Sequence, residues 1–365
     1  MSRSGRRVLF YTEATSRGGA EISLRNLSAA LDPALDVTLM GVDAALCAWI
    51  ASARPGMEVV VIRPPTHKFA LARLLGLRRQ IAQLRPDVFH ANLRTVADAR
   101  YAVLAALSVP GVEVVVVEHA PLPPSTRLGR WLKRRTSRRL GAHVAVGERA
   151  ARLIEEGTGL PRGSVVTVHN GVPDRGSAAP RPNSDSVVAG TFARLDPDKG
   201  IDVLLHAAAP LEDVSVVVAG DGPARDALLA QAGGSGLSDR VRFLPWSETT
   251  RALLDEIDVF VLPSRLEGFP LSILEAMMAG RAVIATDVGS VREAVVHEAT
   301  GLVVPAGDAE GLRDSLARLA RDADERARMG DAGRRRALEL FTVEQMAKGY
   351  EKLYENVLGD PCASH

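Results

Sequence analysis

One stretch decides the fold class of this sequence: Val259-Phe-Val-Leu-Pro-Ser-Arg-Leu-Glu-Gly-Phe-Pro-Leu-Ser-Ile-Leu-Glu275. The apolar run Val259–Leu262 predicts a strand that is buried on both faces, as in a parallel sheet. The residues after it predict a helix, because Pro270 suits a first helical turn and Gly280 suits a helix end. A buried strand that leads directly into a helix indicates an α/β fold.

Short runs of the same kind, rich in β-branched residues, alternate with helical patterns along the whole chain. In the first half the expected strands are Val8–Tyr11, Val37–Met40, Glu58–Ile62, Val88–His90, Val112–Val117, His143–Val146 and Val165–Val168. In the second half they are Val187–Phe192, Val214–Ala219, Val241–Leu244, Val259–Leu262, Ala282–Thr286 and Leu302–Val304. This alternation predicts two doubly wound parallel-sheet domains.

The domain boundaries follow from composition. A chain of 365 residues exceeds what one hydrophobic core usually serves. Residues 173–186 contain three prolines and no hydrophobic period, so they predict a linker between an N-terminal domain at 1–172 and a C-terminal domain at 187–340. Residues 341–365 include apolar residues at helical spacing and predict a C-terminal helix.

Composition excludes several classes of protein. The net charge of +1 gives no overall attraction to nucleic acid, and Cys47 and Cys362 fit neither a disulfide framework nor a structural zinc site. The only apolar run near the start is Val8–Tyr11, which is too short for a signal peptide, and we find no stretch long enough for a membrane-spanning helix. We therefore expect a cytoplasmic protein.

The helix that begins near Pro270 is a candidate anion site. In an open α/β sheet, ligands bind beyond the carboxyl ends of the strands, where helix N-termini offer free N–H groups and a partial positive charge. Glu275 lies one turn past Leu271 with its side chain tilted towards the helix N-terminus. We expect it to face the same ligand as Glu267.

The spacing Glu267-x7-Glu275 resembles the E-x7-E motif of the GT4 family of retaining glycosyltransferases. Other segments match that family in order: Arg17-Gly-Gly-Ala-Glu21, Val116-Val-Glu-His119, Val168-His-Asn-Gly-Val172, Arg194-Leu-Asp-Pro-Asp-Lys-Gly200, Ala219-Gly-Asp-Gly-Pro223 and the segment Thr286–Ser290. The resemblance spans nearly the whole chain. It implies the GT-B fold, with two Rossmann-like domains facing a cleft and the C-terminal helix crossing back to the first domain.

The resemblance also implies roles for residues of the second domain. Arg194 and Lys199 would clamp the donor diphosphate, Glu275 would hold the ribose hydroxyls, and Glu267 would bind the transferred sugar. Gly268, Phe269 and Leu271 belong to the same donor-binding segment. The family typically has glycine after the phenylalanine, whereas this chain has Pro270, which lacks an N–H donor.

In the first domain, the candidates are Gly18, Gly19 and His119. Gly18 and Gly19 follow the first strand, where glycine allows the backbone to approach phosphates or acceptor, although a plain tight turn explains the pair equally well. His119 matches the family histidine near the reacting sugar, and we assign it a positioning or polarising role rather than that of nucleophile.

The function implied is transfer of a hexosyl or N-acetylhexosaminyl group from a nucleoside-diphosphate donor, UDP-sugar in preference to GDP-sugar, to a hydroxyl of a glycan, a lipid-linked or a small-molecule acceptor. The anomeric configuration would be retained, and no metal is expected. The segment Asp196-Pro-Asp198 has the D-x-D pattern of a metal site but reads more readily as a turn. The alternatives are a nucleotide-sugar 2-epimerase, a non-catalytic nucleotide-sugar-binding protein and an NAD-dependent dehydrogenase; for the last, Arg225 occupies the place of the third fingerprint glycine.

The segment Arg127–Arg139 carries seven cations and no acid, with Leu128, Trp131 and Leu132 among them. Such a helix suits peripheral contact with the inner membrane face or an anionic acceptor. A solvated arginine-rich helix explains the pattern slightly better, because its apolar face is short, and the sequence leaves the choice open.

Overall fold

A computed structural model gives the fold of residues 5–63, 70–94, 99–122, 124, 126–179, 186–245 and 250–359. The contacts divide the chain into two compact units. Unit 1 comprises Met1–Gly171 and Val343–His365, and unit 2 comprises Val172–Thr342. Residues 180–185 of the expected linker lie outside the described part of the chain.

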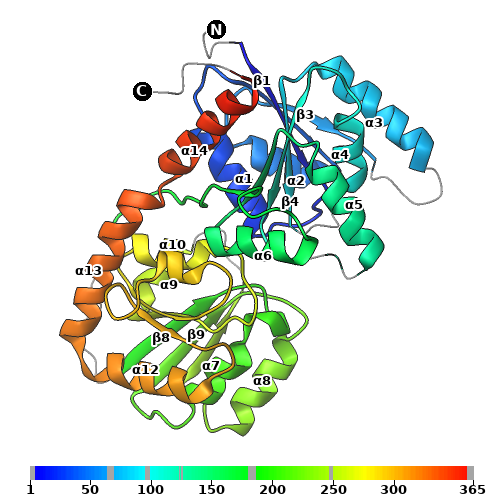
Figure 1. The fold of residues 1–365 in the computed structure, drawn as a ribbon. Coiled ribbons are helices and arrows are strands. Elements are labelled where there is room, and N and C mark those ends of the chain that lie inside the picture. Colours follow the sequence, from blue (N-terminus) through cyan, green and yellow to red (C-terminus); the bar gives the residue numbers. More distant parts are fainter. Residues whose placement is uncertain are drawn as a thin grey trace. The chain divides into compact units, whose positions relative to one another are not determined.

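Unit 1 is built around a seven-stranded parallel sheet with the strand order β3-β2-β1-β4-β5-β6-β7 (Figure 1). Its strands are β1 (Arg7–Thr12), β2 (Asp36–Gly41), β3 (Glu58–Val61), β4 (Val88–Leu93), β5 (Glu113–Glu118), β6 (Ala142–Ala145) and β7 (Val166–Thr167). Its helices are α1 (Gly19–Ala30), α2 (Ala44–Ala51), α3 (Ala70–Leu84), α4 (Arg100–Ala106), α5 (Arg127–Ser137), α6 (Glu148–Thr158) and α14 (Val343–Val357).

Unit 2 is built around a six-stranded parallel sheet with the order β10-β9-β8-β11-β12-β13. Its strands are β8 (Val187–Phe192), β9 (Val214–Ala219), β10 (Val241–Leu244), β11 (Val259–Leu262), β12 (Ala282–Thr286) and β13 (Leu302–Val304). Its helices are the 3-10 turn η2 (Pro197–Lys199), α7 (Ile201–Ala208), α8 (Arg225–Gly234), α9 (Arg251–Glu256), α10 (Leu271–Met278), α11 (Val291–Ala294), α12 (Ala309–Arg321) and α13 (Ala323–Leu340).

Every strand expected from the sequence is present, and the α/β fold class is confirmed. The central strands are buried on both faces, which explains why they read as continuous apolar runs. β4 differs from the prediction because it continues past His90 to Leu93. Its polar residues are paired within the core: His90 Nδ1 lies 2.7 Å from the hydroxyl of Tyr354, and Asn92 donates to the carbonyl of Ala20.

The apolar stripe of α14 is covered by unit 1. Met346, Ala347, Tyr350 and Tyr354 are buried, and α14 packs on α1. The ring of Tyr350 lies 5.2 Å from that of His90. The C-terminal helix is therefore an integral part of the first unit.

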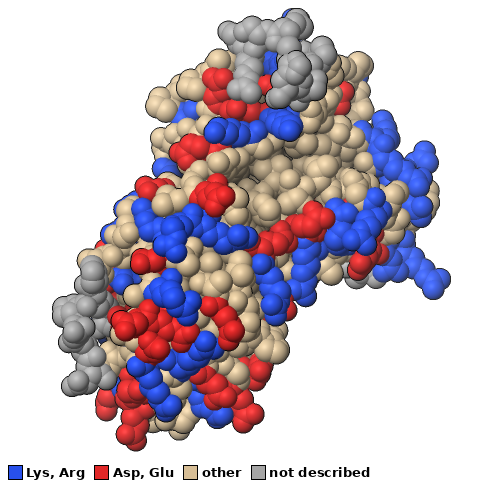
Figure 2. All heavy atoms as spheres, turned by 60° about the vertical axis from the view of Figure 1, so that its left-hand side comes forward, with Lys and Arg blue, Asp and Glu red and all other residues tan. Residues whose placement is uncertain are grey.

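Three general features of the described residues bear on function. In both sheets the chain reverses its direction of winding beside the first strand, between β1 and β4 and between β8 and β11. Ligands of doubly wound proteins bind at such points, beyond the carboxyl ends of the strands. Among the helices in the described ranges, we find none that is both long and apolar enough to cross a membrane. Basic and acidic side chains are interspersed over the face shown in Figure 2.

Candidate functional site

The carboxyl edge of the unit 2 sheet brings together a cluster of charged side chains. Lys199 ends the 3-10 turn after β8, and Glu267 lies in the loop between β11 and α10. Lys199 Nζ lies 2.7 Å from Glu267 Oε1, which also accepts a hydrogen bond of 2.8 Å from the hydroxyl of Ser264. Glu267 therefore holds the Lys199 ammonium at the switch point of this sheet. The Lys199 side chain keeps 24% of its surface exposed, so it remains accessible to a ligand.

Arg194 follows β8 directly and forms an ion pair with Asp196. Its side chain is 58% exposed, which leaves it free to rotate towards an anion in solvent. Asp196 caps the 3-10 turn and Asp198 lies within it, in agreement with the turn interpretation of Asp196-Pro-Asp198. Within the described ranges, no three His, Cys, Asp or Glu side chains are grouped so as to hold a metal ion.

Arg265 fixes the turn that carries Lys199. Its guanidinium donates to both carboxylate oxygens of Asp202, at 2.8 and 2.6 Å, and to the carbonyl of Pro197 at 2.7 Å. Hydrogen bonding from this guanidinium lowers the pKa of Asp202 below its usual range. The backbone N–H of Arg265 donates to the carbonyl of Asp198. These bonds join the loop after β11 to the loop after β8, which sets the distance between Glu267 and Lys199.

The turn after β12 packs against the backbone of Glu267 and Gly268 and forms a hydrogen bond with it. Gly289 has φ +50, and a Cβ atom there would lie 2.2 Å from the carbonyl oxygen of Glu267. The N–H of Ser290 donates to the carbonyl of Gly268 at 2.7 Å. Only glycine permits this approach, which explains the glycine at the fourth position of Thr286–Ser290.

The remaining predicted residues of this segment are mostly buried. Phe269 is 3% exposed and packs edge-on against Phe341, with ring centroids 5.2 Å apart. Leu271 begins α10 and is 8% exposed, and Pro270 is the residue that caps the helix. Phe269 and Leu271 can therefore offer a ligand their backbone rather than their side chains.

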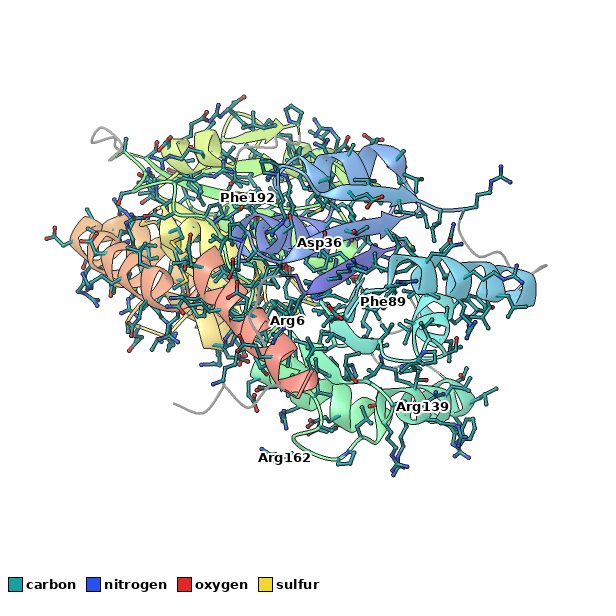
Figure 3. The ribbon with its side chains drawn as sticks, turned by 90° about the horizontal axis from the view of Figure 1, so that it is seen from above. Arg6, Asp36, Phe89, Arg139, Arg162 and Phe192 are labelled. Atoms are coloured by element: carbon teal, nitrogen blue, oxygen red, sulfur yellow. The ribbon has the colours of Figure 1, made fainter. Side chains whose placement is uncertain are left out.

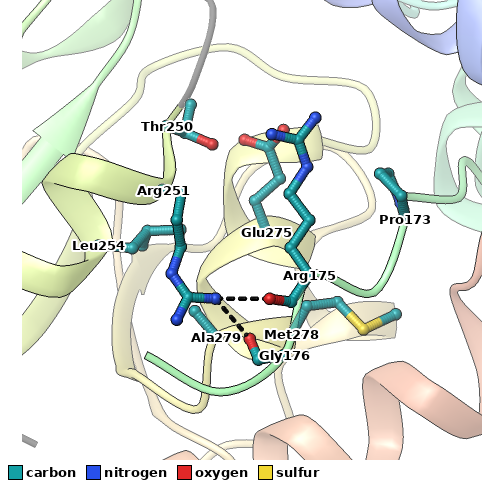
Figure 4. A pocket seen from close by; sticks show the side chains of 9 residues that line it. All are labelled: Pro173, Arg175, Gly176, Thr250, Arg251, Leu254, Glu275, Met278 and Ala279. Atoms are coloured by element: carbon teal, nitrogen blue, oxygen red, sulfur yellow. Dashed lines mark hydrogen bonds between the residues drawn. The ribbon is translucent and has the colours of Figure 1, made fainter. Parts of the chain in front are cut away.

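Glu275 has different neighbours from Glu267. It lines a pocket of unit 2 with Pro173, Arg175, Gly176, Thr250, Arg251, Leu254, Met278 and Ala279 (Figure 4). Burial raises the pKa of Glu275 to about 7, although a hydrogen bond with Thr250 and the charge of Arg175 act in the opposite direction. None of these lining residues belongs to the Lys199–Glu267 cluster, so the two carboxylates of the motif have separate surroundings.

Arginines from unit 2 hold residues 174–179 against this pocket. Arg251 donates to the carbonyls of Arg175, Gly176 and Ser177 at 2.7, 2.9 and 2.6 Å, two of which are drawn in Figure 4. Arg334 makes a paired contact with Asp174 at 2.9 and 3.0 Å. This part of the expected linker is therefore a wall of the pocket, and it places Arg175 beside Glu275.

The carboxyl edge of the unit 1 sheet carries the other predicted residues. Gly18 caps α1 in an extended conformation, with φ −137, so the pair is not a turn that needs left-handed backbone at Gly18. A Cβ atom on Gly18 would approach Glu21, whereas one on Gly19 would meet no atom within 4 Å among the described residues. The start of α1 therefore has open space beside Gly19, as the approach of a ligand to a helix N-terminus requires.

His119 follows β5 at the same edge and is held by Asn92. The Nε2 atom of His119 lies 2.8 Å from Asn92 Oδ1, while Asn92 Nδ2 donates to the carbonyl of Ala20 at 3.1 Å. Because the amide oxygen of Asn92 can only accept, Nε2 of His119 carries the proton and Nδ1 is an acceptor. Burial lowers the pKa of His119 to about 4, so the ring is neutral at pH 7. The ring can position a hydroxyl group but cannot supply a positive charge.

Sequence reasoning missed four residues that shape these sites: Asn92, Arg175, Thr250 and Ser264. Asn92 lies in β4 beyond the end of the expected strand Val88–His90, although an amide beside a run of apolar residues is a signal that it has a buried partner. Ser264 and Thr250 lie in loops with no distinguishing pattern. Arg175 was assigned to the linker, and its place beside Glu275 depends on the hydrogen bonds from Arg251.

The chain is similar in sequence to known glycosyltransferases. Residues 17–175 match the family model described as Glycosyltransferase Family 4, and residues 175–336 match the model described as Glycosyl transferases group 1. The chain is 30% identical over 329 residues to the MMP alpha-(1->4)-mannosyltransferase of Mycolicibacterium hassiacum, covering 81% of this chain and 75% of the relative. It is 29% identical over 329 residues to the lipopolysaccharide core biosynthesis mannosyltransferase LpcC of Rhizobium leguminosarum bv. viciae, covering 84% and 90%.

The fold also matches solved structures. The crystal structure of Anabaena HepE in complex with UDP superposes with a TM-score of 0.82 at 21% identity, covering 95% of this chain and 98% of that one. The chain belongs to the group 1 glycosyltransferases of family GT4, and its two parallel-sheet units are the Rossmann-like domains of the GT-B fold.

Proposed function

We propose that the protein transfers a hexosyl or N-acetylhexosaminyl group from a nucleoside-diphosphate sugar, UDP-sugar in preference to GDP-sugar, to a hydroxyl acceptor, with retention of the anomeric configuration and without a divalent metal. The acceptor is a glycan, a lipid-linked sugar or a small molecule. The observation that carries this proposal is the Lys199–Glu267–Ser264 cluster beside Arg194 at the switch point of the unit 2 sheet.

The charge of the leaving group explains why cations are needed there. The diphosphate gains negative charge as its bond to the sugar breaks, and preorganised cations lower the barrier most when they are fixed before the reaction. Glu267 and Ser264 fix Lys199, and Arg265 fixes the turn that carries it. In our proposal Lys199 and Arg194 bind the diphosphate, and the N–H groups at the start of α10 add further donors.

Retention requires that the acceptor oxygen bonds to the sugar on the face from which the diphosphate departs. The bond from the anomeric carbon to the phosphate oxygen breaks, the bond to the acceptor oxygen forms, and the acceptor proton passes to the departing diphosphate. Glu267 binds the sugar through a hydroxyl. In unit 1, His119 would accept a hydrogen bond from a substrate hydroxyl at Nδ1, consistent with its neutral ring.

The nucleoside is assigned to the Glu275 pocket. A carboxylate accepts well from the two hydroxyls of a ribose, and Thr250 and Arg175 supply polar groups beside it. Relatives support hexosyl transfer, since the Rhizobium and Mycolicibacterium proteins are named mannosyltransferases, and a structural neighbour was solved with UDP-glucose.

The test needs no knowledge of the acceptor, because water can take its place. The full chain, in EDTA, is incubated separately with UDP-glucose, GDP-mannose and ADP-glucose, and the sugar released is followed by proton NMR before it mutarotates. We expect release from UDP-glucose with α-glucose as the first product. If β-glucose appears first, the retaining mechanism is wrong. A nucleotide sugar epimerised at carbon 2 would instead identify an epimerase.

A further inference from the structure

Helix α5 exposes its large apolar side chains to solvent, unlike an ordinary surface helix. Leu128, Trp131 and Leu132 are 66%, 56% and 50% exposed. None of the residues of α5, all of which the structure describes, is buried. A helix on the outside of a domain normally turns its apolar stripe to the core. Here the large apolar side chains point to solvent, and Figure 3 shows side chains of this region projecting outward near the labelled Arg139.

The inner side of α5 is held by charge rather than by apolar packing. Lys133 forms an ion pair with Glu118, and His143 Nε2 lies 3.0 Å from the same Glu118 oxygen. Burial would raise the pKa of Glu118, but the Lys133 ammonium and the His143 ring outweigh it and lower that pKa to about 2. The carboxylate is therefore ionised at neutral pH, and it fixes Lys133 inward. Because residue 133 faces the sheet, the opposite side of the helix must face out.

The outer side of α5 combines apolar and basic residues. On the helix, Leu128, Trp131, Leu132 and Arg135 are neighbours at spacings of three and four. Arg127, Arg134 and Arg138 lie beside them and are also exposed. Residues 127–139 contain no acid that could neutralise these arginines. We call these seven residues the α5 surface.

We propose that the α5 surface docks the protein on an anionic lipid bilayer. Trp and Leu gain free energy by entering the apolar boundary of the bilayer, while arginines beside them reach the anionic headgroups. A nucleic acid would match the arginines but offer nothing to the exposed leucines. A second copy joined through the same surface would bring two sets of arginines together, and like charges repel. This role is independent of the transfer reaction.

The test uses the full chain and two kinds of vesicle, phosphatidylcholine alone and phosphatidylcholine with an equal part of phosphatidylglycerol. The test variant carries Arg134→Gln, Arg135→Gln and Arg138→Gln. The matched control carries Arg162→Gln, Arg321→Gln and Arg335→Gln, which remove the same charge from exposed sites elsewhere. Each cation near an anionic surface contributes about fivefold to partitioning, so the test variant should bind the anionic vesicles roughly 100-fold more weakly.

A second readout places the helix in the bilayer. The emission of wild-type tryptophan should shift to shorter wavelength with anionic vesicles, and Trp131→Ala should abolish the shift while Trp49 and Trp246 remain. The proposal is overturned if the wild type ignores anionic vesicles, if the control loses as much binding as the test variant, or if the shift survives in Trp131→Ala. Dimerisation that Leu132→Ser abolishes, without vesicle binding, would assign the surface to a second copy.

Discussion

At the scale of single residues, the most informative group is Glu275. Its folded-state pKa of about 7 lies above the 4.5 of an ordinary glutamate, because burial opposes its charge. The side chain is therefore part neutral and part ionised near neutral pH. A ribose diol donates to a carboxylate better than to a neutral carboxyl group, so the affinity for the nucleoside should follow this ionisation.

We predict that the affinity for UDP-glucose rises roughly tenfold between pH 6 and pH 8, as the ionised fraction of Glu275 increases about the raised pKa. The diphosphate of this donor does not titrate in that range, so the change comes from the protein. Glu275→Gln should bind weakly at both values, as measured by isothermal titration calorimetry. Equal pH profiles for wild type and variant would show that Glu275 does not hold the ribose.

The same pKa shift predicts an effect on stability. A carboxyl group with a raised folded-state pKa stabilises the fold below the unfolded pKa of about 4.5, and this contribution is lost as the pH rises through about 7. Glu275→Gln should therefore raise Tm at pH 8 and leave it nearly unchanged at pH 5. A variant less stable than wild type at pH 8 would contradict the assignment of burial as the cause.

His119 owes its orientation to one residue, Asn92. Replacing Asn92 by aspartate places a carboxylate 2.8 Å from the ring nitrogen, and an adjacent negative charge favours the protonated imidazole. We predict that the pKa of His119, about 4 in the wild type, rises by at least one unit in Asn92→Asp, as followed by NMR of the ring. An unchanged titration would show that the two side chains do not interact in solution.

At the scale of elements, the site depends on how closely three loops of unit 2 approach one another. The turn at Gly289 supports the backbone of Glu267, and the loop after β11 braces the turn that carries Lys199. A change in any of these loops moves the charged side chains without touching them. Substitution of two glycines with left-handed backbone distinguishes the effect of backbone strain from that of a steric clash.

We predict that Gly307→Ala, with φ +78 and no atom within 4 Å of the new Cβ among the described residues, costs only the strain of a left-handed alanine, about 1 kcal/mol. Gly289→Ala adds a clash 2.2 Å from the Glu267 carbonyl, so it should cost several times more and should also weaken UDP binding. Urea denaturation and calorimetry measure the two effects. Equal values for the two variants would rule out the proposed support of Glu267.

At the scale of the whole molecule, the sequence predicts the architecture well because buried parallel strands leave continuous apolar runs, as in β8 and β11. The sequence revealed the motif Glu267-x7-Glu275. It did not show that the two carboxylates have separate partners, because Thr250 and Ser264 belong to no recognisable sequence motif. The basic segment 127–139 was expected as a helix. That Lys133 turns inward could not be predicted, because it depends on the buried Glu118 of a neighbouring strand.

In the proposed mechanism, fixed cations rather than a divalent metal hold the donor diphosphate. Lys199 is the best placed of them, since Glu267 holds its ammonium at 2.7 Å and the switch point lies beside it. A hydrogen bond between charged groups contributes about 1.5–3 kcal/mol, which corresponds to roughly 10- to 150-fold in affinity.

The most direct measurement is the affinity for UDP in excess EDTA, by isothermal titration calorimetry, for the wild type, Lys199→Ala and Lys348→Ala. Lys348 is exposed on α14 and serves as the matched control. We predict that the wild type and Lys348→Ala bind UDP equally, and that Lys199→Ala binds at least tenfold more weakly. If Lys199→Ala binds UDP as tightly as the wild type, Lys199 does not hold the diphosphate and the proposed mechanism is wrong. The proposed mechanism is also wrong if EDTA abolishes UDP binding and manganese restores it in the wild type but not in a variant that carries Asp196→Asn and Asp198→Asn.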